Sequence, residues 1–494
     1  MDYVGYEWLR NKFGLTAFAV SPPACVRPVA RISEQNGILA IPAQSAPEPD
    51  NVLGHILFAL KHEGTHLQIL SQALRHVPAN ELHKAVRENP NGRYLRVTAF
   101  LWEHFTHQAM SDLPAQTGAY VDVFSPDLYI TADKPQRNSR WRVNFNGLGS
   151  LGYCATVRRT PEIERGVALD IPGRSREFMQ TLPAHTRERT LSWAYLHETE
   201  SSFAIEREKP TGNRAEDFMR LLRVAHDGHQ ITEGYLCELQ SSAVANPLER
   251  AASFRQQQNW LSNGVKGAVG VSYVPPPPML LHELIPEWMA FANEAPRKLD
   301  PVIAASVTSF GFVYLHPFMD GNGRISRFMF HQALCASGEL DMGELLPVSA
   351  AMNRHEQDYL AVLQTFSKPA RETVAVTWID EGQFIFQFKP DADAIYRYWD
   401  ATACAEFGFQ MTEAALEVEL KQEAEFLERY DKIMKQVGEQ VDIRGSDLSL
   451  LVISCLENDG VLSNNKRKKY GQTIPKEALD LIEASVQKSR AQHI

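Results

Sequence analysis

One twelve-residue segment constrains the fold more than any other stretch of the chain: residues 316–327 read HPFMDGNGRISR. Pro317 disfavours helical backbone in the residue before it, so an apolar helix predicted over 301–315 must end near His316. The sequence Gly-Asn-Gly at 321–323 lets backbone N–H groups approach a ligand closely, and a second helix is predicted from about Arg324. The segment therefore predicts two helices joined by a short loop that faces the N-terminus of the second helix.

The side chains of this segment suit chemistry at a phosphate. A glycine loop that leads into a helix N-terminus is a ready anion site, and Arg324 and Arg327 lie three apart on one helical face. Asp320 offers a carboxylate to magnesium already held by phosphates, and His316 is suited to take up a proton at neutral pH. An exposed turn would explain any one of these features but not all of them, so the segment predicts phosphoryl or nucleotidyl transfer with His316 catalytic. The predicted nucleotide-binding residues are Gly321, Asn322, Gly323, Arg324 and Arg327.

The segment resembles the motif of the Fic (Fido) family, H-P-F-x-[DE]-G-N-G-R-x-x-R, and every specified position is present. The resemblance implies a mainly α protein with a Fic-type helical core that transfers AMP from ATP to a hydroxyl side chain of a target protein. It also implies that His316 deprotonates that hydroxyl, that Asp320 holds Mg²⁺, and that Arg324 and Arg327 bind the outer phosphates. ATP and a target protein, the chain itself included, are the implied partners, and a homo-oligomer stays open.

A second pattern of the same family lies upstream. Many Fic proteins carry an inhibitory helix with the sequence [ST]-x-x-x-E-[GN], and Ser202 to Arg207 fits five of its six positions. We predict an inhibitory helix over about 195–207 in which Glu206 pairs with Arg327 and takes the place that the γ-phosphate needs. Arg207 departs from the pattern and puts the end of that helix in doubt. The alternative is that Glu206 is an ordinary exposed glutamate.

A β-hairpin is predicted at 252–274, where an Asn-Gly turn at 263–264 separates two extended stretches and four prolines follow at 275–278. The Fic resemblance places its flap here, a hairpin that pairs with an extended target segment by strand addition. The residues expected to bind the target are Gln258, Asn259 and Trp260.

Helical regions are expected on both sides of this core. We predict a helical N-terminal region over 1–125, which contains an amphipathic helix from Val52 to Leu74. A connector of loops and short strands over 126–190 leads into the Fic core at 191–370. A helical C-terminal region over 371–494 completes the chain.

Composition narrows the class of protein. The 494 residues contain 50 Lys+Arg and 60 Asp+Glu, a net charge of −10, which disfavours non-specific binding to nucleic acid or anionic lipid. No run of about 18 apolar residues predicts a membrane-spanning helix, and the N-terminus does not have the pattern of a signal peptide. Six scattered cysteines without a CxxC pair favour a reducing compartment. A cytoplasmic protein is therefore expected.

Several alternatives remain open at this point. Residues 62–66 read HEGTH, an HExxH match that in a zinc hydrolase would use Glu63 as the base. A GxGxxG match at 147–152 lacks the expected strand–turn–helix context and is interpreted as a loop, and the basic run at 466–469 as a solvated turn. On the Fic scaffold itself, the chain could transfer another nucleotide, remove AMP with water activated near Glu206, or bind nucleotide as a regulatory module without catalysis.

Overall fold

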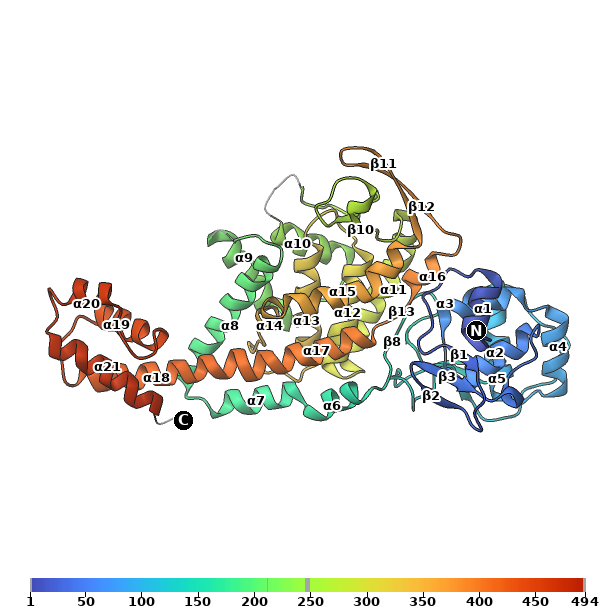
Figure 1. The fold of residues 1–494 in the computed structure, drawn as a ribbon, viewed down its shortest axis with the longest axis horizontal. Helices are drawn as coiled ribbons and strands as arrows, with labels where there is room; N and C mark the ends of the chain where they lie inside the picture. The colour runs from blue at the N-terminus through green and yellow to red at the C-terminus, as the bar shows by residue number, and fades with distance from the viewer. Residues whose placement is uncertain (1, 211, 245–248, 492–494) are drawn as a thin grey trace.

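The computed structural model describes residues 2–210, 212–244 and 249–491. The molecule is elongated, and three parts follow one another along its long axis (Figure 1). An N-terminal part lies at one end, a large helical core lies in the middle, and a small helical module that contains the C-terminus lies at the other end. The mainly α fold class is confirmed.

The central core is built around a helix that is buried on every side. This helix, α12 (Pro301–Leu315), starts where the side chain of Asp300 accepts hydrogen bonds from the first backbone N–H groups, and nearly all of its residues are buried. It packs most extensively against α13 (Asn322–Ala336), which confirms the two predicted helices. The other helices of the core are α8 (Ala184–Ile205), α9 (Gly212–Val224), α10 (Glu233–Ala243), α11 (Pro278–Glu294), α14 (Val348–Arg354) and α15 (Glu356–Arg371).

The N-terminal part is mixed rather than helical throughout. Its helices are α1 (Gly5–Phe13), α2 (Val52–His62), α3 (Leu67–Ala73), α4 (Ala79–Glu88) and α5 (Arg93–Thr106). Its first sheet has the order β1-β3-β2, from β1 (Ala24–Val26), β2 (Ser33–Gln35) and β3 (Ile38–Ile41). The single helix expected from Val52 to Leu74 is wrong: the chain breaks between α2 and α3, where Gly64 has φ 88°.

The connector agrees with the sequence only over its first half. Short strands are present as expected, namely β4 (Val121–Asp122), β5 (Gln136–Asn138), β6 (Val143–Phe145), β7 (Leu148–Gly149) and β8 (Cys154–Thr156). The second half needs correction, because it forms α6 (Pro161–Leu169) and α7 (Ile171–Thr181). The start signals of α6 are the capping side chain of Thr160 and the proline that follows it, which the sequence interpretation did not use.

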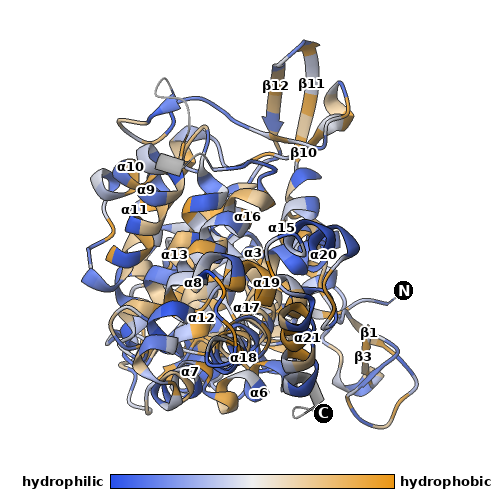
Figure 2. Cartoon of the chain, turned by 90° about the vertical axis from the view of Figure 1, so that its left-hand side faces the viewer, coloured by the Kyte–Doolittle hydropathy of each residue, from blue (hydrophilic) through white to orange (hydrophobic). Residues whose placement is uncertain are grey.

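The C-terminal region begins with a hairpin that was not expected. Strands β11 (Val374–Asp380) and β12 (Gln383–Phe388) pair antiparallel, with Val374 opposite Phe388, and the hairpin projects from the core (Figure 2). Alternation of apolar and polar residues in both strands is the signal that the helical expectation missed. After α16 (Asp393–Arg397), strand β13 (Tyr398–Asp400) pairs parallel with β8 and so joins this region to the connector.

One long helical run connects the core to the terminal module (Figure 1). It comprises α17 (Thr402–Ala414), a π-helical turn at Ala415–Leu420 and α18 (Lys421–Gly438). The module beyond it contains α19 (Gly445–Glu457), α20 (Asn464–Tyr470) and α21 (Lys476–Ala491), which share a small apolar core of their own with the end of α18. Among the described residues, no helix is both long enough and apolar enough to cross a bilayer.

Candidate active site

His316 lies at the point where α12 ends. It adopts a left-handed conformation, φ 50° and ψ 59°, as the cap of that helix, and it is 8% exposed. Its Nδ1 lies 3.0 Å from the carbonyl oxygen of Val313, so Nδ1 carries the proton and Nε2 holds the free lone pair. Burial lowers the pKa of His316 to about 4. The imidazole is therefore neutral at pH 7 and able to accept a proton.

The loop after His316 is fixed by side chains that bond its backbone. Asn322 accepts a hydrogen bond from the N–H of Phe318 at 3.0 Å and donates one to the carbonyl oxygen of the same residue at 2.8 Å. Arg255, which the sequence analysis did not single out, donates through Nε to the carbonyl oxygen of His316 at 2.8 Å, and its backbone N–H donates to that of Pro317. Asn322 thus contributes its side chain to the shape of the loop, and only its backbone is left for the predicted anion site.

The anion site itself lies at the start of α13. Gly321 has φ 87°, which only glycine adopts without strain. A Cβ at Gly323 would lie 2.0 Å from Oε1 of Glu206, so the carboxylate of Glu206 rests directly on the backbone at this helix N-terminus. Backbone N–H groups and the helix dipole favour an anion here. In this structure the carboxylate is that anion.

Arg327 holds the same carboxylate, and it is 2% exposed. Its Nη2 donates to Oε1 of Glu206 at 2.9 Å, while its Nε and Nη2 donate to the hydroxyl and carbonyl oxygens of Ser202 at 2.9 and 2.7 Å. The predicted pair of Glu206 and Arg327 is therefore present. Burial acts to raise the pKa of Glu206, but the charge of Arg327 and its hydrogen bond outweigh it, and the net pKa is lowered. Glu206 is ionised at neutral pH.

The end of α8, the helix predicted to be inhibitory, explains the last position of its sequence pattern. Helix α8 ends at Ile205, and Arg207 adopts a left-handed φ of 57°. The N–H of Arg207 donates to the carbonyl oxygen of Ala204, and that of Glu208 donates to Phe203, which is the Schellman arrangement that glycine favours at this position. Arg207 adopts this left-handed conformation although it is strained for arginine. The Gly or Asn of the pattern would adopt it at a lower cost in free energy.

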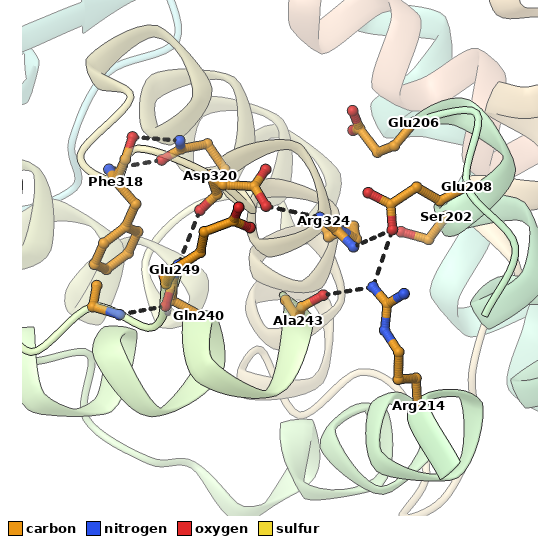
Figure 3. A network of polar contacts seen from close by, with 12 residues as sticks. Ser202, Glu206, Glu208, Arg214, Gln240, Ala243, Glu249, Phe318, Asp320 and Arg324 are labelled. Atoms are coloured by element: carbon orange, nitrogen blue, oxygen red, sulfur yellow. Dashed lines mark hydrogen bonds and ion pairs between the residues drawn. The ribbon is translucent and has the colours of Figure 1, made fainter. Parts of the chain in front are cut away.

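The first motif arginine, Arg324, also pairs with carboxylates (Figure 3). It is 2% exposed, and its Nη1 donates to Oε2 of Glu208 at 3.0 Å while its Nη2 lies 3.6 Å from Oδ2 of Asp320. The side chain of Asp320 is 46% exposed and lies beside the anion site. A single accessible carboxylate there suits Mg²⁺, which binds through one or two carboxylates plus substrate phosphates. Within the described ranges no group of three or more metal-ligating side chains occurs, so the remaining ligands would come from phosphates and water.

The flap hairpin is present but shorter than expected. Strands β9 (Leu261–Ser262) and β10 (Val271–Tyr273) pair antiparallel, with Ser262 opposite Val271. The loop between them, residues 263–270, includes Gly264 at φ 85°. The predicted hairpin included residues 254–260 as a strand, and this part of the prediction is wrong. In the structure these residues form an irregular segment that leads into the hairpin.

The three side chains expected to bind a target also make contacts within the protein, and their role in target binding stays a prediction. Asn259 is 5% exposed and donates to the carbonyl oxygen of Phe318 at 2.9 Å, and Gln258 donates to that of Pro275. Trp260 packs against Phe384 and Phe386 of β12. These contacts hold the segment that leads into the flap in place.

The HExxH stretch does not form a metal-binding helix. Helix α2 ends at His62 and α3 begins at Leu67, so the two histidines are not one turn apart on one helix. Oε1 of Glu63 accepts a hydrogen bond from the backbone N–H of Tyr6 at 3.0 Å, and burial raises the pKa of Glu63 to about 8. A carboxyl that is protonated at neutral pH is not a general base there. The geometry for zinc hydrolysis is therefore not built.

The other two sequence matches are structural. The GxGxxG match at 147–152 lies in β7 and the turn before β8, with no helix after it, so its interpretation as a loop needs only the addition of these short strands. The basic run at 466–469 lies in α20 rather than in a turn. Its Arg467 pairs with Asp480 and Glu483 of α21.

Comparison with known proteins agrees with the geometry of the His316 loop. The model of the Fic/DOC family matches residues 230–334, the stretch that contains α12, this loop and most of α13. The protein carries a Fic domain. The protein adenylyltransferase Fic of Nematostella vectensis is 32% identical over 97 residues, which cover 19% of this chain and 20% of that protein. The chain thus matches only about a fifth of that Fic relative.

Two further proteins are similar to this chain at lower sequence identity. The actin-related protein 2/3 complex subunit 5-like protein of Homo sapiens is 29% identical over 137 residues, which cover 26% of this chain and 84% of that protein. A crystal structure of a Fic family protein from Desulfovibrio desulfuricans G20 is 18% identical with a TM-score of 0.38, and it covers 63% of this chain and 84% of that one.

Proposed function

We propose that this Fic-type transferase moves AMP from ATP to a hydroxyl side chain of a protein, and that Glu206 restrains the reaction. The carboxylate of Glu206, bonded to Arg327 and resting on Gly323, is the observation that supports this proposal most. A helix N-terminus and a buried arginine that together hold a carboxylate have the chemistry to hold a phosphate. The site is therefore one for a phosphorylated substrate that competes with a residue of the chain.

The roles of the residues follow from their positions. Nε2 of His316 takes the proton of the target hydroxyl as that oxygen attacks the α-phosphorus of ATP. The new oxygen–phosphorus bond forms while the bond between the α-phosphorus and the bridging oxygen breaks, and pyrophosphate leaves. Its negative charge is stabilised by the N-terminus of α13 and by Arg324 and Arg327. His316 then releases the proton to solvent.

Asp320 is the carboxylate that would hold magnesium, because it is accessible and lies beside the anion site. Bound magnesium supplies positive charge that offsets the charge of the phosphates. The side chain of Asp320 also lies 3.6 Å from Arg324, so the same carboxylate helps to orient the first motif arginine.

Glu206 is proposed to restrain the reaction by competition for one place. Because its pKa is lowered, Glu206 stays ionised and paired with Arg327 at neutral pH. A γ-phosphate that reached Arg327 would have to displace this carboxylate or be repelled by it. ATP is then held in a pose that does not place its α-phosphorus near His316.

The test is the Glu206→Gly protein with ATP labelled in the α-phosphate or in the γ-phosphate, in the presence of cell lysate. We expect protein-bound label from the α-phosphate only, at least about tenfold above the unsubstituted chain, because one charge-assisted contact that blocks the site is removed. The matched control is Glu200→Gly, an exposed glutamate of the same helix, which should leave labelling unchanged.

Two outcomes would contradict the proposal. One is a Glu206→Gly protein that binds ATP but never transfers label from its α-phosphate. The other is labelling that persists in the double variant Glu206→Gly/His316→Ala. A γ-label on protein would instead identify phosphate transfer.

A further inference from the structure

A third arginine lies beside the motif arginines although it is outside the motif. Arg214 belongs to α9, and its Nη2 donates to Oε2 of Glu208 at 3.0 Å. The same oxygen accepts from Nη1 of Arg324 at 3.0 Å (Figure 3). One carboxylate oxygen therefore lies between two guanidinium groups. The same Nη2 also donates to the carbonyl oxygen of Ala243, at 3.4 Å.

The two guanidinium groups share one aromatic neighbour as well. The Cζ atoms of Arg214 and Arg324 lie 4.9 and 5.2 Å from the ring centroid of Phe203, which is fully buried. Two like charges this close repel each other unless an anion lies between them. The Nε of each is buried without a hydrogen-bond partner in the described part of the chain. Even with Asp320 at 3.6 Å from Nη2 of Arg324, the pair therefore has donors that these two carboxylates do not satisfy.

Glu208 repeats, two residues later, what Glu206 does. Glu206 places its carboxylate on Arg327 and on the backbone of Gly323. Glu208 places its carboxylate on Arg324 and on Arg214. The two carboxylates come from the same end of α8 and cover adjacent cationic positions. A substrate with more than one phosphate group presents an anionic group for each of these positions, which a single phosphate does not.

We propose that Arg214 is a third phosphate-binding arginine for ATP, and that Glu208 covers it together with Arg324 until the nucleotide displaces Glu208. The inference rests on the proposed function, since it assigns a further ligand to the same triphosphate. Its consequence is that removing Glu206 alone exposes only Arg327. Arg324 and Arg214 stay covered, so full affinity for ATP needs the departure of both carboxylates.

A simpler role for Arg214 is to position Glu208, and the two roles give opposite results in one experiment. We would measure the Kd of magnesium-ATP by isothermal titration calorimetry, with all variants made in the Glu206→Gly chain. Glu208→Gln should tighten binding about tenfold, because the competing charge is removed. In that Glu208→Gln background, Arg214→Gln should weaken binding about tenfold if Arg214 contacts phosphate. An unchanged Kd in that background would overturn the proposal, because an arginine that only positions Glu208 has nothing left to position.

Controls separate this effect from damage to the fold. Arg220→Gln changes a 73% exposed arginine of the same helix, which pairs with Asp217, and should leave the Kd unchanged. Arg214→Lys keeps the charge and should restore part of the affinity. AMP, which lacks the outer phosphates, should bind equally well with and without Arg214, and a loss of AMP binding would count against the assignment.

The experiment also distinguishes the two proposals. Calorimetry measures binding and not transfer, so a chain that binds ATP through Arg214 but never transfers AMP would leave this inference standing and overturn the proposed function. A Glu206→Gly chain that does not bind ATP at all would overturn both.

Discussion

Residues 316–327 and residues 62–66 are both recognisable as motifs from their letters, yet only one of them folds into the geometry that its pattern implies. The first segment carries its own determinants of shape: Pro317 follows the end of α12, Gly321 supplies a positive φ, and Asn322 bonds the backbone of Phe318. The HExxH pattern specifies only the candidate metal ligands and the base. It contains no residue that fixes the backbone, so the continuous helix that it requires depends on the surrounding sequence. Gly64 ends that helix. A motif that encodes its own backbone is the better predictor of local geometry.

The two regions also treat their buried charges differently. Each buried arginine of the first region has a carboxylate as its partner, so Glu206 stays ionised and its pKa is lowered. Glu63 in the second region is half-buried and accepts a hydrogen bond from a backbone N–H, and burial raises its pKa to about 8. The first arrangement is ready to exchange one anion for another. The second is a neutral hydrogen-bonded contact that stabilises the packing of α1 on α2.

Gly64→Ala tests whether residues 62–66 form a helix, and we expect it to have the largest effect on stability of the changes considered. If residues 62–66 formed a helix, alanine would stabilise it by about 1 kcal/mol. In this structure Gly64 has φ 88°, and a Cβ there would lie 2.5 Å from the hydroxyl of Tyr129. We therefore expect a loss of about 3 kcal/mol in the free energy of unfolding, measured by urea denaturation.

The matched change is Gly234→Ala, a glycine in the first turn of α10 whose Cβ would meet open space, and it should cost nothing or stabilise slightly. A Gly64→Ala chain as stable as the parent would show that the break between α2 and α3 is not fixed by backbone conformation. The HExxH alternative would then deserve a zinc-binding measurement.

Glu63→Gln tests, through the pH dependence of stability, whether the carboxyl of Glu63 is neutral in the folded chain. A carboxyl whose pKa is raised on folding binds more protons in the folded chain than in the unfolded chain, so its contribution to stability is present at low pH and is lost as pH rises toward about 8. Glutamine keeps the acceptor for the N–H of Tyr6 and cannot ionise. We expect the free energy of unfolding of the parent to fall by about 2 kcal/mol more than that of Glu63→Gln between pH 5.5 and 8.5.

Parallel urea denaturation of the two proteins at several pH values checks this, with Glu81→Gln as the control at an exposed glutamate of α4. If the free energy of unfolding depended on pH in the same way for the parent and for Glu63→Gln, Glu63 would be ionised in the folded state. The distinction drawn above between the two regions would then fail.

The sequence predicts which motif residues of the central site lie together because their arrangement is local. His316, Asp320 and the two motif arginines lie within one loop and one helix turn, so their proximity follows from spacing alone. Glu206 was also found, because the resemblance supplied a second pattern. Glu208, Arg214 and Arg255 were missed because each meets the site only through tertiary packing, from α8, α9 and the segment before the flap.

Errors in the fold have the same physical origin. The hairpin β11–β12 was missed because most of the C-terminal region is helical and the whole region was predicted as helix. Helices α6 and α7 were missed because the prolines and glycines of the connector predicted loops. Likewise, Asn259 contacts Phe318 and Trp260 contacts Phe384, and the sequence does not show these contacts because each joins segments that are distant along the chain.

Arg207→Gly gives the smallest effect and addresses the one position at which the first region departs from its pattern. Because Arg207 is held at φ 57° by the hydrogen bonds that end α8, glycine should stabilise the chain by about 0.5–1 kcal/mol. Arg207→Asn, which tolerates the same conformation better than arginine, should give a smaller gain. Urea denaturation measures both, and basal AMP transfer should not rise in either variant, since a better helix end keeps Glu206 on Arg327. A rise in transfer would mean that the guanidinium of Arg207, and not its backbone conformation, holds Glu206 on Arg327.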